Sequence, residues 1–179
     1  MHHRALSLSV AVGLLVGPAM PASAAKPEDV FKGKIIICKN RLPMRFSSPG
    51  AFTAAVAKVR TDKVWPTEQK GNDHATWNLE YVAFFAQPLT DSEVVVKFFD
   101  ITAGKRLVAT DPQYTREKGS RIFGSNIQLA KPEFEVNKHY MMTLESRRRT
   151  IASTTFWLRG KGPSYSGKVQ FSDEETRAR

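Results

Sequence analysis

The most concentrated charge in this sequence is a run of three arginines, Arg147, Arg148 and Arg149. A guanidinium group binds phosphate, sulfate or carboxylate through two parallel hydrogen bonds. Three of them in one tight turn repel each other unless counterions or a partner supply negative charge. The run is therefore a candidate anion-binding site, and the simpler interpretation is a solvated turn.

Other residues with binding chemistry are scattered along the chain. The weaker candidates for ligand contact are Arg116, Lys118, Arg121, Trp65 and His74. A third basic stretch comprises Lys32, Lys34, Lys39, Arg41 and Arg45. The three tryptophans, Trp65, Trp77 and Trp157, would suit sugars if they formed one platform, but we expect Trp77 in the core and Trp65 against the end of a helix.

No spacing of residues indicates a metal site or a cofactor. His74 and His139 are the only histidines beyond the first residues of the chain. Asp73 precedes His74 directly, and adjacent side chains seldom converge on one ion. Neither a G-x-S-x-G motif nor a glycine-rich phosphate loop is present. We expect no metal, no cofactor and no catalytic residue.

A small secreted hydrolase is the minor alternative. Its carboxylates would come from Glu80, Asp100 and Glu145, which would have to converge with Asp73 and His74 in one cleft. Glu80, Asp100 and Glu145 each lie in a segment expected to be a strand. A carboxylate exposed to solvent on the polar face of that strand is the simpler interpretation.

Cys38 is the only cysteine, so the fold contains no internal disulfide and must be stabilised by its core. Three isoleucines precede it, which indicates a small buried hydrophobic residue rather than a reactive thiol.

The first 24 residues have the three parts of a secretory signal peptide. Arg4 supplies the positive charge, Ala5 to Val16 form an apolar run, and Ala22-Ser23-Ala24 provides a small-residue cleavage site. The apolar run is shorter than the roughly 20 residues that span a membrane. We expect a cleaved leader, a periplasmic or extracellular protein, and no transmembrane span after cleavage.

The remainder is long enough for one domain. The full sequence has an apolar fraction of 41% and an aromatic fraction of 10%, which suffice for a core. The formal net charge of +10 favours anionic partners. We expect a protein partner in the cell envelope, or anionic polysaccharide or lipid head groups, and no nucleic acid, because basic and aromatic residues rarely interleave.

A helix is predicted from Pro49 to Arg60. Ser48 is a suitable N-cap, and a proline is favoured at the first helical position. Phe52, Val56 and Val59 fall on one face, which we expect to pack against an edge or end of a sheet.

Strands are predicted from alternation and from apolar runs. They cover Gly33 to Lys39, Trp77 to Ala86, Glu93 to Ile101, Lys105 to Thr110, Arg121 to Leu129, His139 to Arg147, Thr150 to Arg159 and Lys168 to Phe171. The short connection after Ala86 predicts an antiparallel hairpin with the next strand. A second hairpin, with the arginines at its tip, joins the strands on either side of Arg148.

About seven strands and one short amphipathic helix predict an antiparallel β-sandwich. The segment from Phe134 to Tyr140 resembles the corner before the penultimate strand of immunoglobulin-like domains, where a tyrosine hydroxyl ties the corner to the backbone. We expect a flexible segment at 25–32, the sandwich at 33–171 and a charged, disordered tail at 172–179.

These features together predict an exported, non-catalytic binding or accessory module of a bacterial envelope or surface apparatus. Exposed strand edges would offer backbone pairing to a protein partner. The alternative is binding of an anionic glycan or lipid head group through the basic loops.

Overall fold

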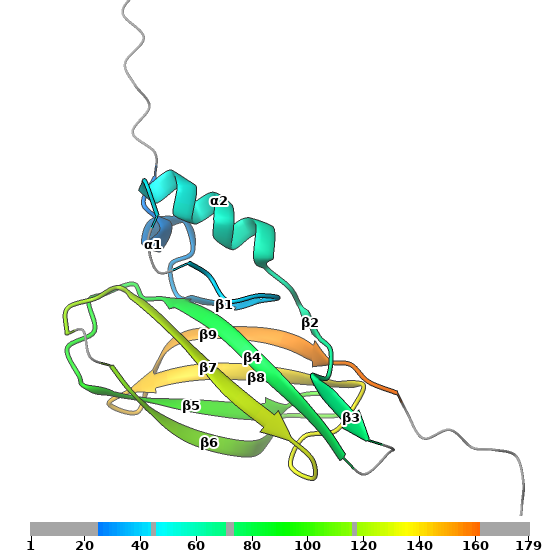
Figure 1. Ribbon diagram of the computed structural model, residues 1–179. Helices are drawn as coiled ribbons and strands as arrows, with labels where there is room; N and C mark the ends of the chain where they lie inside the picture. Colours follow the sequence, from blue (N-terminus) through cyan, green and yellow to red (C-terminus); the bar gives the residue numbers. More distant parts are fainter. Residues whose placement is uncertain (1–24, 44–45, 71–73, 116–117, 162–179) are drawn as a thin grey trace, which may run out of the picture.

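The computed structural model describes residues 25–43, 46–70, 74–115 and 118–161, and these residues form a mostly β fold (Figure 1). The elements are α1 (Pro27–Val30), β1 (Lys34–Cys38), α2 (Pro49–Val59), β2 (Lys63–Val64), β3 (Glu68–Lys70), β4 (His74–Phe84), β5 (Glu93–Asp100), β6 (Arg106–Tyr114), β7 (Ile122–Ala130), β8 (Lys138–Ser146) and β9 (Arg149–Leu158). The mostly β prediction is confirmed. The leader, the strand predicted at 168–171 and the tail lie outside the described residues.

The strands form one curled sheet of mixed orientation. Its main order is β7, β4, β1, β9, β8, β5, β6, with β3 beside β4 and β2 beside β9. Most pairs are antiparallel, but β9 runs parallel to both β1 and β2. The prediction of a purely antiparallel fold was therefore wrong at this joint, where the first long strand meets the last.

The inner side of the curl holds the main core. Alternate residues of the long strands point inward and are fully buried, among them Trp77, Phe98, Tyr140 and Phe156. The indole nitrogen of Trp77 donates a hydrogen bond to the carbonyl of Arg159 at 2.9 Å, so its polar atom is satisfied inside the core.

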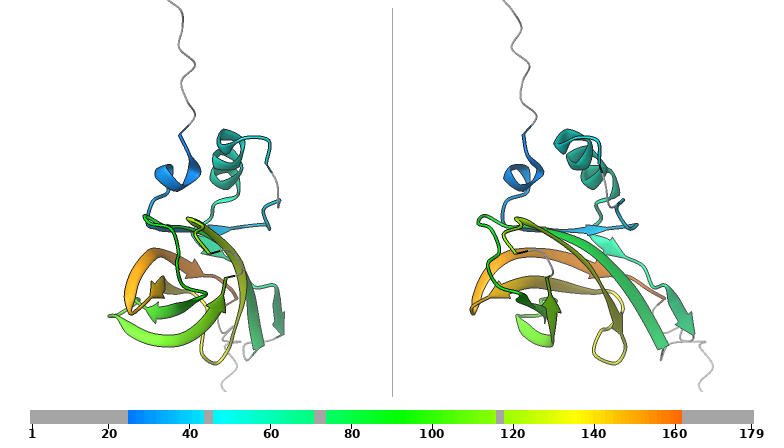
Figure 2. Two further views of the ribbon diagram at one scale, coloured as in Figure 1. Left: turned by 90° about the vertical axis from the view of Figure 1, so that its left-hand side faces the viewer. Right: turned by 60° about the vertical axis from the view of Figure 1, so that its left-hand side comes forward.

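A second, smaller core lies on the outer side of β1 and β4, under α2. Ile36 and Cys38 face this layer, while Ile35 and Ile37 face the main core, so β1 is covered on both sides as its apolar run predicts. Figure 2 shows both helices on the side of β1 that faces away from the main core. The helix packs on a face of the sheet rather than at an edge or end.

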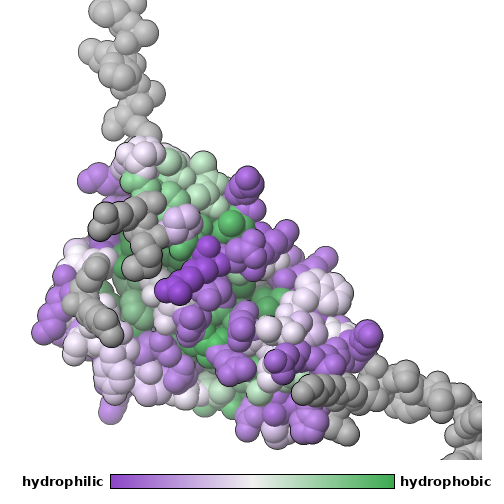
Figure 3. All heavy atoms as spheres, viewed as in Figure 1, coloured by the Kyte–Doolittle hydropathy of each residue, from purple (hydrophilic) through white to green (hydrophobic). Residues whose placement is uncertain are grey.

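Helix α2 begins at the predicted residue and buries the predicted apolar side. The hydroxyl of Ser48 accepts a hydrogen bond from the N–H of Ala51 at 3.1 Å, and Pro49 is the first helical residue. Val56 is fully buried, with Phe52 and Val59 packed around it. In Figure 3, hydrophobic residues gather over this helical layer and hydrophilic residues cover much of the remaining surface. No helix among the described residues is long and apolar enough to cross a membrane.

Part of the segment expected to be flexible is held in place. Residues 27–30 form α1, and Phe31 is 9% exposed, with its ring centroid 5.0 Å from that of Phe84. Burial of the Phe31 ring holds residues 27–31 against the sheet, although their sequence shows no periodic pattern of apolar residues.

The predicted hairpin between β4 and β5 was wrong. β4 pairs with β1, β3 and β7, while β5 pairs with β6 and β8. The connection between them contains the buried Leu89 and crosses from one side of the curl to the other. A short connection allows a hairpin but does not require one. Here both edges of β4 are occupied by β1, β3 and β7, so β5 cannot pair with it.

The second predicted hairpin is confirmed, since β8 and β9 pair antiparallel over their whole lengths. Strand β6 extends to Tyr114, four residues beyond the predicted strand. The tyrosine corner is also present, because the Tyr140 hydroxyl accepts a hydrogen bond from the N–H of Glu135 at 2.9 Å.

Candidate functional site

The arginine run lies at the tip of the β8–β9 hairpin, as predicted. Arg147 and Arg148 are the two turn residues, with φ of 50° and 64°. Both positive angles are typical of a two-residue hairpin turn, which favours asparagine and glycine because a Cβ atom is strained there.

Arg147 has an internal partner. Its Nη2 and Nε donate hydrogen bonds to Oδ1 of Asp91 at 2.7 and 3.0 Å, and the Ser146 hydroxyl donates to Oδ2 of the same carboxylate. The bonds from Ser146 and Arg147 lower the pKa of Asp91, and the charge of Lys118 contributes in the same direction. This carboxylate therefore neutralises part of the charge that the sequence suggested was free for a ligand.

The surroundings of the tip are balanced in charge. A shallow cavity of about 360 Å³ beside it is lined by three carboxylates and three cations, namely Asp91, Glu93, Glu145, Lys97, Arg147 and Arg148. Lys97 and Glu145 pair at 2.6 Å. Within the described residues, Arg148 and Arg149 have no carboxylate partner, but the tip as a whole is not a cluster of uncompensated positive charge.

The weaker candidates do not form one site. Arg121 pairs with Asp29 at 3.1 Å and donates to the carbonyl of Phe85. His74 is exposed at the start of β4, and Lys118 is exposed near Asp91. Trp65 is 67% exposed, so the expectation that it packs against a helix end was wrong. Arg116 lies outside the described residues.

The three carboxylates considered for hydrolysis are dispersed. Glu80 faces the amide of Asn126, Glu145 pairs with Lys97, and Asp100 lies at the end of β5. Asp73 is outside the described residues, which contain no group of three residues able to hold a metal ion.

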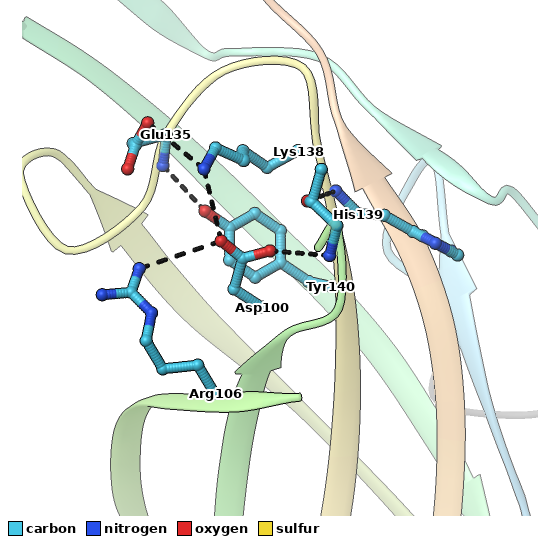
Figure 4. A network of polar contacts seen from close by, with 7 residues as sticks. Asp100, Arg106, Glu135, Lys138, His139 and Tyr140 are labelled. Carbon is cyan, nitrogen blue, oxygen red and sulfur yellow. Dashed lines mark hydrogen bonds and ion pairs between the residues drawn. The ribbon is translucent and has the colours of Figure 1, made fainter. Parts of the chain in front are cut away.

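Asp100 is the centre of a polar network at one end of the sheet (Figure 4). It is 7% exposed and accepts hydrogen bonds from the N–H of Thr102 at 2.8 Å and from Nζ of Lys138 at 3.4 Å. Arg106 adds an ion pair at 3.8 Å. Burial opposes ionisation, but the bonds from Thr102 and Lys138 outweigh it and lower the pKa of Asp100. Because the Asp100 carboxylate already has these partners, we interpret it as a structural contact that holds the end of β5 beside the Tyr140 corner.

Cys38 is 6% exposed, as predicted. Burial, with a smaller effect of the Glu80 charge, raises its pKa to about 11. A thiol with this pKa is protonated at neutral pH and is a poor nucleophile.

A surface that the sequence did not reveal lies on the outer face of β9, β8 and β5. His139 pairs with Trp157, and Met141 pairs with Phe99. Directly paired residues share a face, and the neighbours of these four are buried inside, so all four side chains point outward. We call Trp157, His139, Met141 and Phe99 the aromatic row.

Cations cover both ends of the aromatic row. The rings of His139 and Trp157 are stacked with centroids 4.5 Å apart and planes 7° apart, and the Arg159 guanidinium lies 4.7 Å from the Trp157 ring. At the other end, Nζ of Lys105 lies 4.4 Å from the centroid of Phe99. Neither Arg159 nor Lys105 has a carboxylate within 4.0 Å among the residues that the structure describes.

The row continues to the neighbouring strands. Leu107 pairs with Phe99 and is 53% exposed. Lys63 pairs with Trp157 from β2, and the exposed Trp65 follows two residues later. Half-exposed rings with unpaired cations can bind a ligand that has both flat apolar faces and negative charge.

No protein-family model and no curated protein shows a significant match to the chain. Among solved structures, a glycosyl hydrolase family 2 member from Bacteroides cellulosilyticus is similar with a TM-score of 0.38 and 11% identity over 52% of this chain and 15% of that chain. A β-glucosidase from Kluyveromyces marxianus in complex with glucose gives 0.28 and 12% identity over 55% of this chain and 14% of that chain. The chain thus spans a small part of each protein, and the likeness is too distant to support an argument about activity.

Proposed function

We propose that this protein is an exported, non-catalytic binding module of a bacterial cell envelope, and that the aromatic row is its binding surface. The observation that carries the proposal is the contact of outward-facing rings with cations that have no carboxylate partner among the described residues, on a sheet face that no described helix or strand covers. The leader-like first 24 residues support export. The dispersal of Glu80, Asp100 and Glu145 supports binding rather than hydrolysis.

The finer fold in this proposal is an immunoglobulin-like sandwich. β7, β4 and β1 would form one layer, and β9, β8, β5 and β6 the other, with the main core between them. The hydrogen bond at the Tyr140 corner supports this assignment, since immunoglobulin-like domains have such a corner before their penultimate strand. The parallel pairing of β1 with β9 would then join the two layers along one side.

Retention on envelope material tests the function. The mature protein is mixed with washed envelope fragments of the source bacterium, and the bound fraction is measured. We expect the double variant Phe99→Leu, Trp157→Leu to lose most of its retention, because it keeps apolar side chains but removes both rings.

The control is Lys58→Gln with Tyr114→Leu, which removes an exposed cation on α2 and an exposed ring at the far end of β6. Equal retention of both double variants would contradict the proposed surface. Recovery of the native protein from the cytosol would contradict export.

A further inference from the structure

We propose that the aromatic row binds a linear acidic polysaccharide whose repeating sugars carry carboxylates. This inference rests on the proposed binding function and names the ligand. The spacing of the cations, the chemistry of the rings and the charges beside them favour such a ligand.

The spacing favours an extended ligand with repeated charge. Trp157 lies on β9 and Arg159 directly after its end, whereas Phe99 lies on β5 and Lys105 in the turn after it. Strand β8 separates β9 from β5. Neighbouring strands are about 4.8 Å apart, so β9 and β5 are about 10 Å apart. A lipid head group or a small anion would reach one of the two cations, whereas a polyanion lying across the strands reaches both.

The rings favour sugars over a simple acidic peptide. The apolar face of a sugar ring stacks on an aromatic side chain, as a carboxylate side chain does not. The Trp157 indole is already held by the His139 ring stacked against it and by β9, so it loses little conformational freedom when a ligand binds.

The cations can exchange partners when the ligand arrives. Arg159 and Lys105 lie over the rings they contact, and both have long, flexible side chains. A charge-assisted hydrogen bond to a carboxylate is stronger than an exposed cation–π contact. Each cation therefore moves to a carboxylate while a sugar takes its place on the ring.

The surroundings limit the site on one side. Lys97, the next residue along β5 on the same face as Phe99, forms an ion pair at 2.6 Å with Glu145, which lies further along β8, and the two charges neutralise each other. The ligand therefore lies along the row from β2 towards β6, where Lys63 extends the positive charge and Leu107 ends the apolar surface.

Calorimetry with defined polymers tests this inference. The mature protein is titrated with oligogalacturonate, with neutral dextran, with poly-L-glutamate and with oligo-dT at the same ionic strength. We expect oligogalacturonate to bind at least about tenfold more tightly than the other three, because only it combines sugar rings with repeated carboxylates.

Matched variants locate the binding. Arg159→Gln and Lys105→Gln should each weaken oligogalacturonate binding about three- to tenfold, and Trp157→Leu about tenfold. Lys58→Gln removes the same charge elsewhere, and Tyr114→Leu removes an exposed ring elsewhere, so each should change the affinity less than twofold. Lys105 is exposed, so its variant keeps the test valid if Trp157→Leu fails to fold.

The outcomes separate the ligand from the function. Equal binding of dextran, tighter binding of poly-L-glutamate or oligo-dT, or equal weakening by Lys58→Gln would overturn the inference. If no polymer binds while retention on envelope material still depends on Phe99 and Trp157, the ligand is wrong and the proposed function stands. If retention does not depend on them either, both are wrong.

Discussion

Two arginines at the tip of the β8–β9 hairpin hold a backbone conformation that is costly for their type. Arg147 and Arg148 both have positive φ, but only Arg147 gains a compensating contact, the paired hydrogen bonds to Asp91. The strain at Arg148 therefore has no visible compensation within the described part of the chain.

Replacing Arg148 with glycine should stabilise the protein. Removing the Cβ atom from a left-handed position relieves about 1 kcal/mol of strain, less the extra freedom of glycine in the unfolded chain. We expect a higher urea midpoint for Arg148→Gly. Arg147→Gly is the comparison, since it relieves the same strain but loses the Asp91 contacts; a larger gain for it than for Arg148→Gly would contradict this explanation.

Residue-level predictions succeeded where the decisive neighbours are close in sequence. The burial of Trp77 and Cys38 follows from the alternation or apolar run in which each lies. The partner of Arg147 is 56 positions away in the chain, and the exposure of Trp65 depends on the pairing of β2 with β9. The residues next to Arg147 and Trp65 in the sequence therefore do not reveal either contact.

At the scale of elements, the corner before β8 couples a loop to the core. Tyr140 is 1% exposed, its ring packs against Phe134 and Phe156, and its hydroxyl accepts the N–H of Glu135. The corner thus fixes the point at which the chain enters β8.

Tyr140→Phe should lower the free energy of unfolding by about 1–2 kcal/mol, because the N–H of Glu135 then loses its acceptor. Chemical denaturation of the variant measures this loss. Tyr114→Phe, at a 71% exposed position, should change stability by less than about 0.5 kcal/mol. Equal effects of the two substitutions would show that the corner hydrogen bond is not a net stabilising contact.

Elements were predictable to the extent that their contacts are local. The cap at Ser48, the strands β7 to β9 and the hairpin between β8 and β9 all follow from short-range patterns. The order of β4 and β5 does not, because strand pairing depends on which edges are already taken. The aromatic row could not be predicted for the same reason, since it joins residues 99, 139 and 157 through the pairing of three strands.

At the scale of the whole molecule, the Asp100 network makes stability depend on pH. Lys138 bonds both Asp100 and, at 3.7 Å, Glu135, so the network links the end of β5 with the corner before β8. The lowered pKa of Asp100 means that ionisation favours the folded state.

Because the pKa of Asp100 is lower in the folded state, the protein is more stable when this carboxyl is ionised. Above the ordinary carboxyl pKa of about 3.9 the stabilisation is fully present, and it is lost as pH falls through the lower pKa of the folded state. Asp100→Asn should therefore be less stable than the native chain at neutral pH, and the difference should shrink as the pH drops below about 4. Denaturant titrations at several pH values measure it. Asp62→Asn, at an exposed carboxylate, is the control, and parallel pH profiles for Asp100→Asn and the native chain would refute the prediction.

The position of β1 determines when the sheet can close during synthesis of the chain. This strand, complete by residue 38, lies between a partner that ends at residue 84 and another that ends at residue 158. A growing polypeptide cannot pair β1 with β9 until Ser153, the partner of Lys34, has been synthesised, so one edge of β1 stays unpaired until then. Pairing between strands that are far apart in the sequence slows folding and keeps the nascent chain incompletely folded for longer. A loose chain is also the form in which a polypeptide can be threaded through a narrow translocation channel.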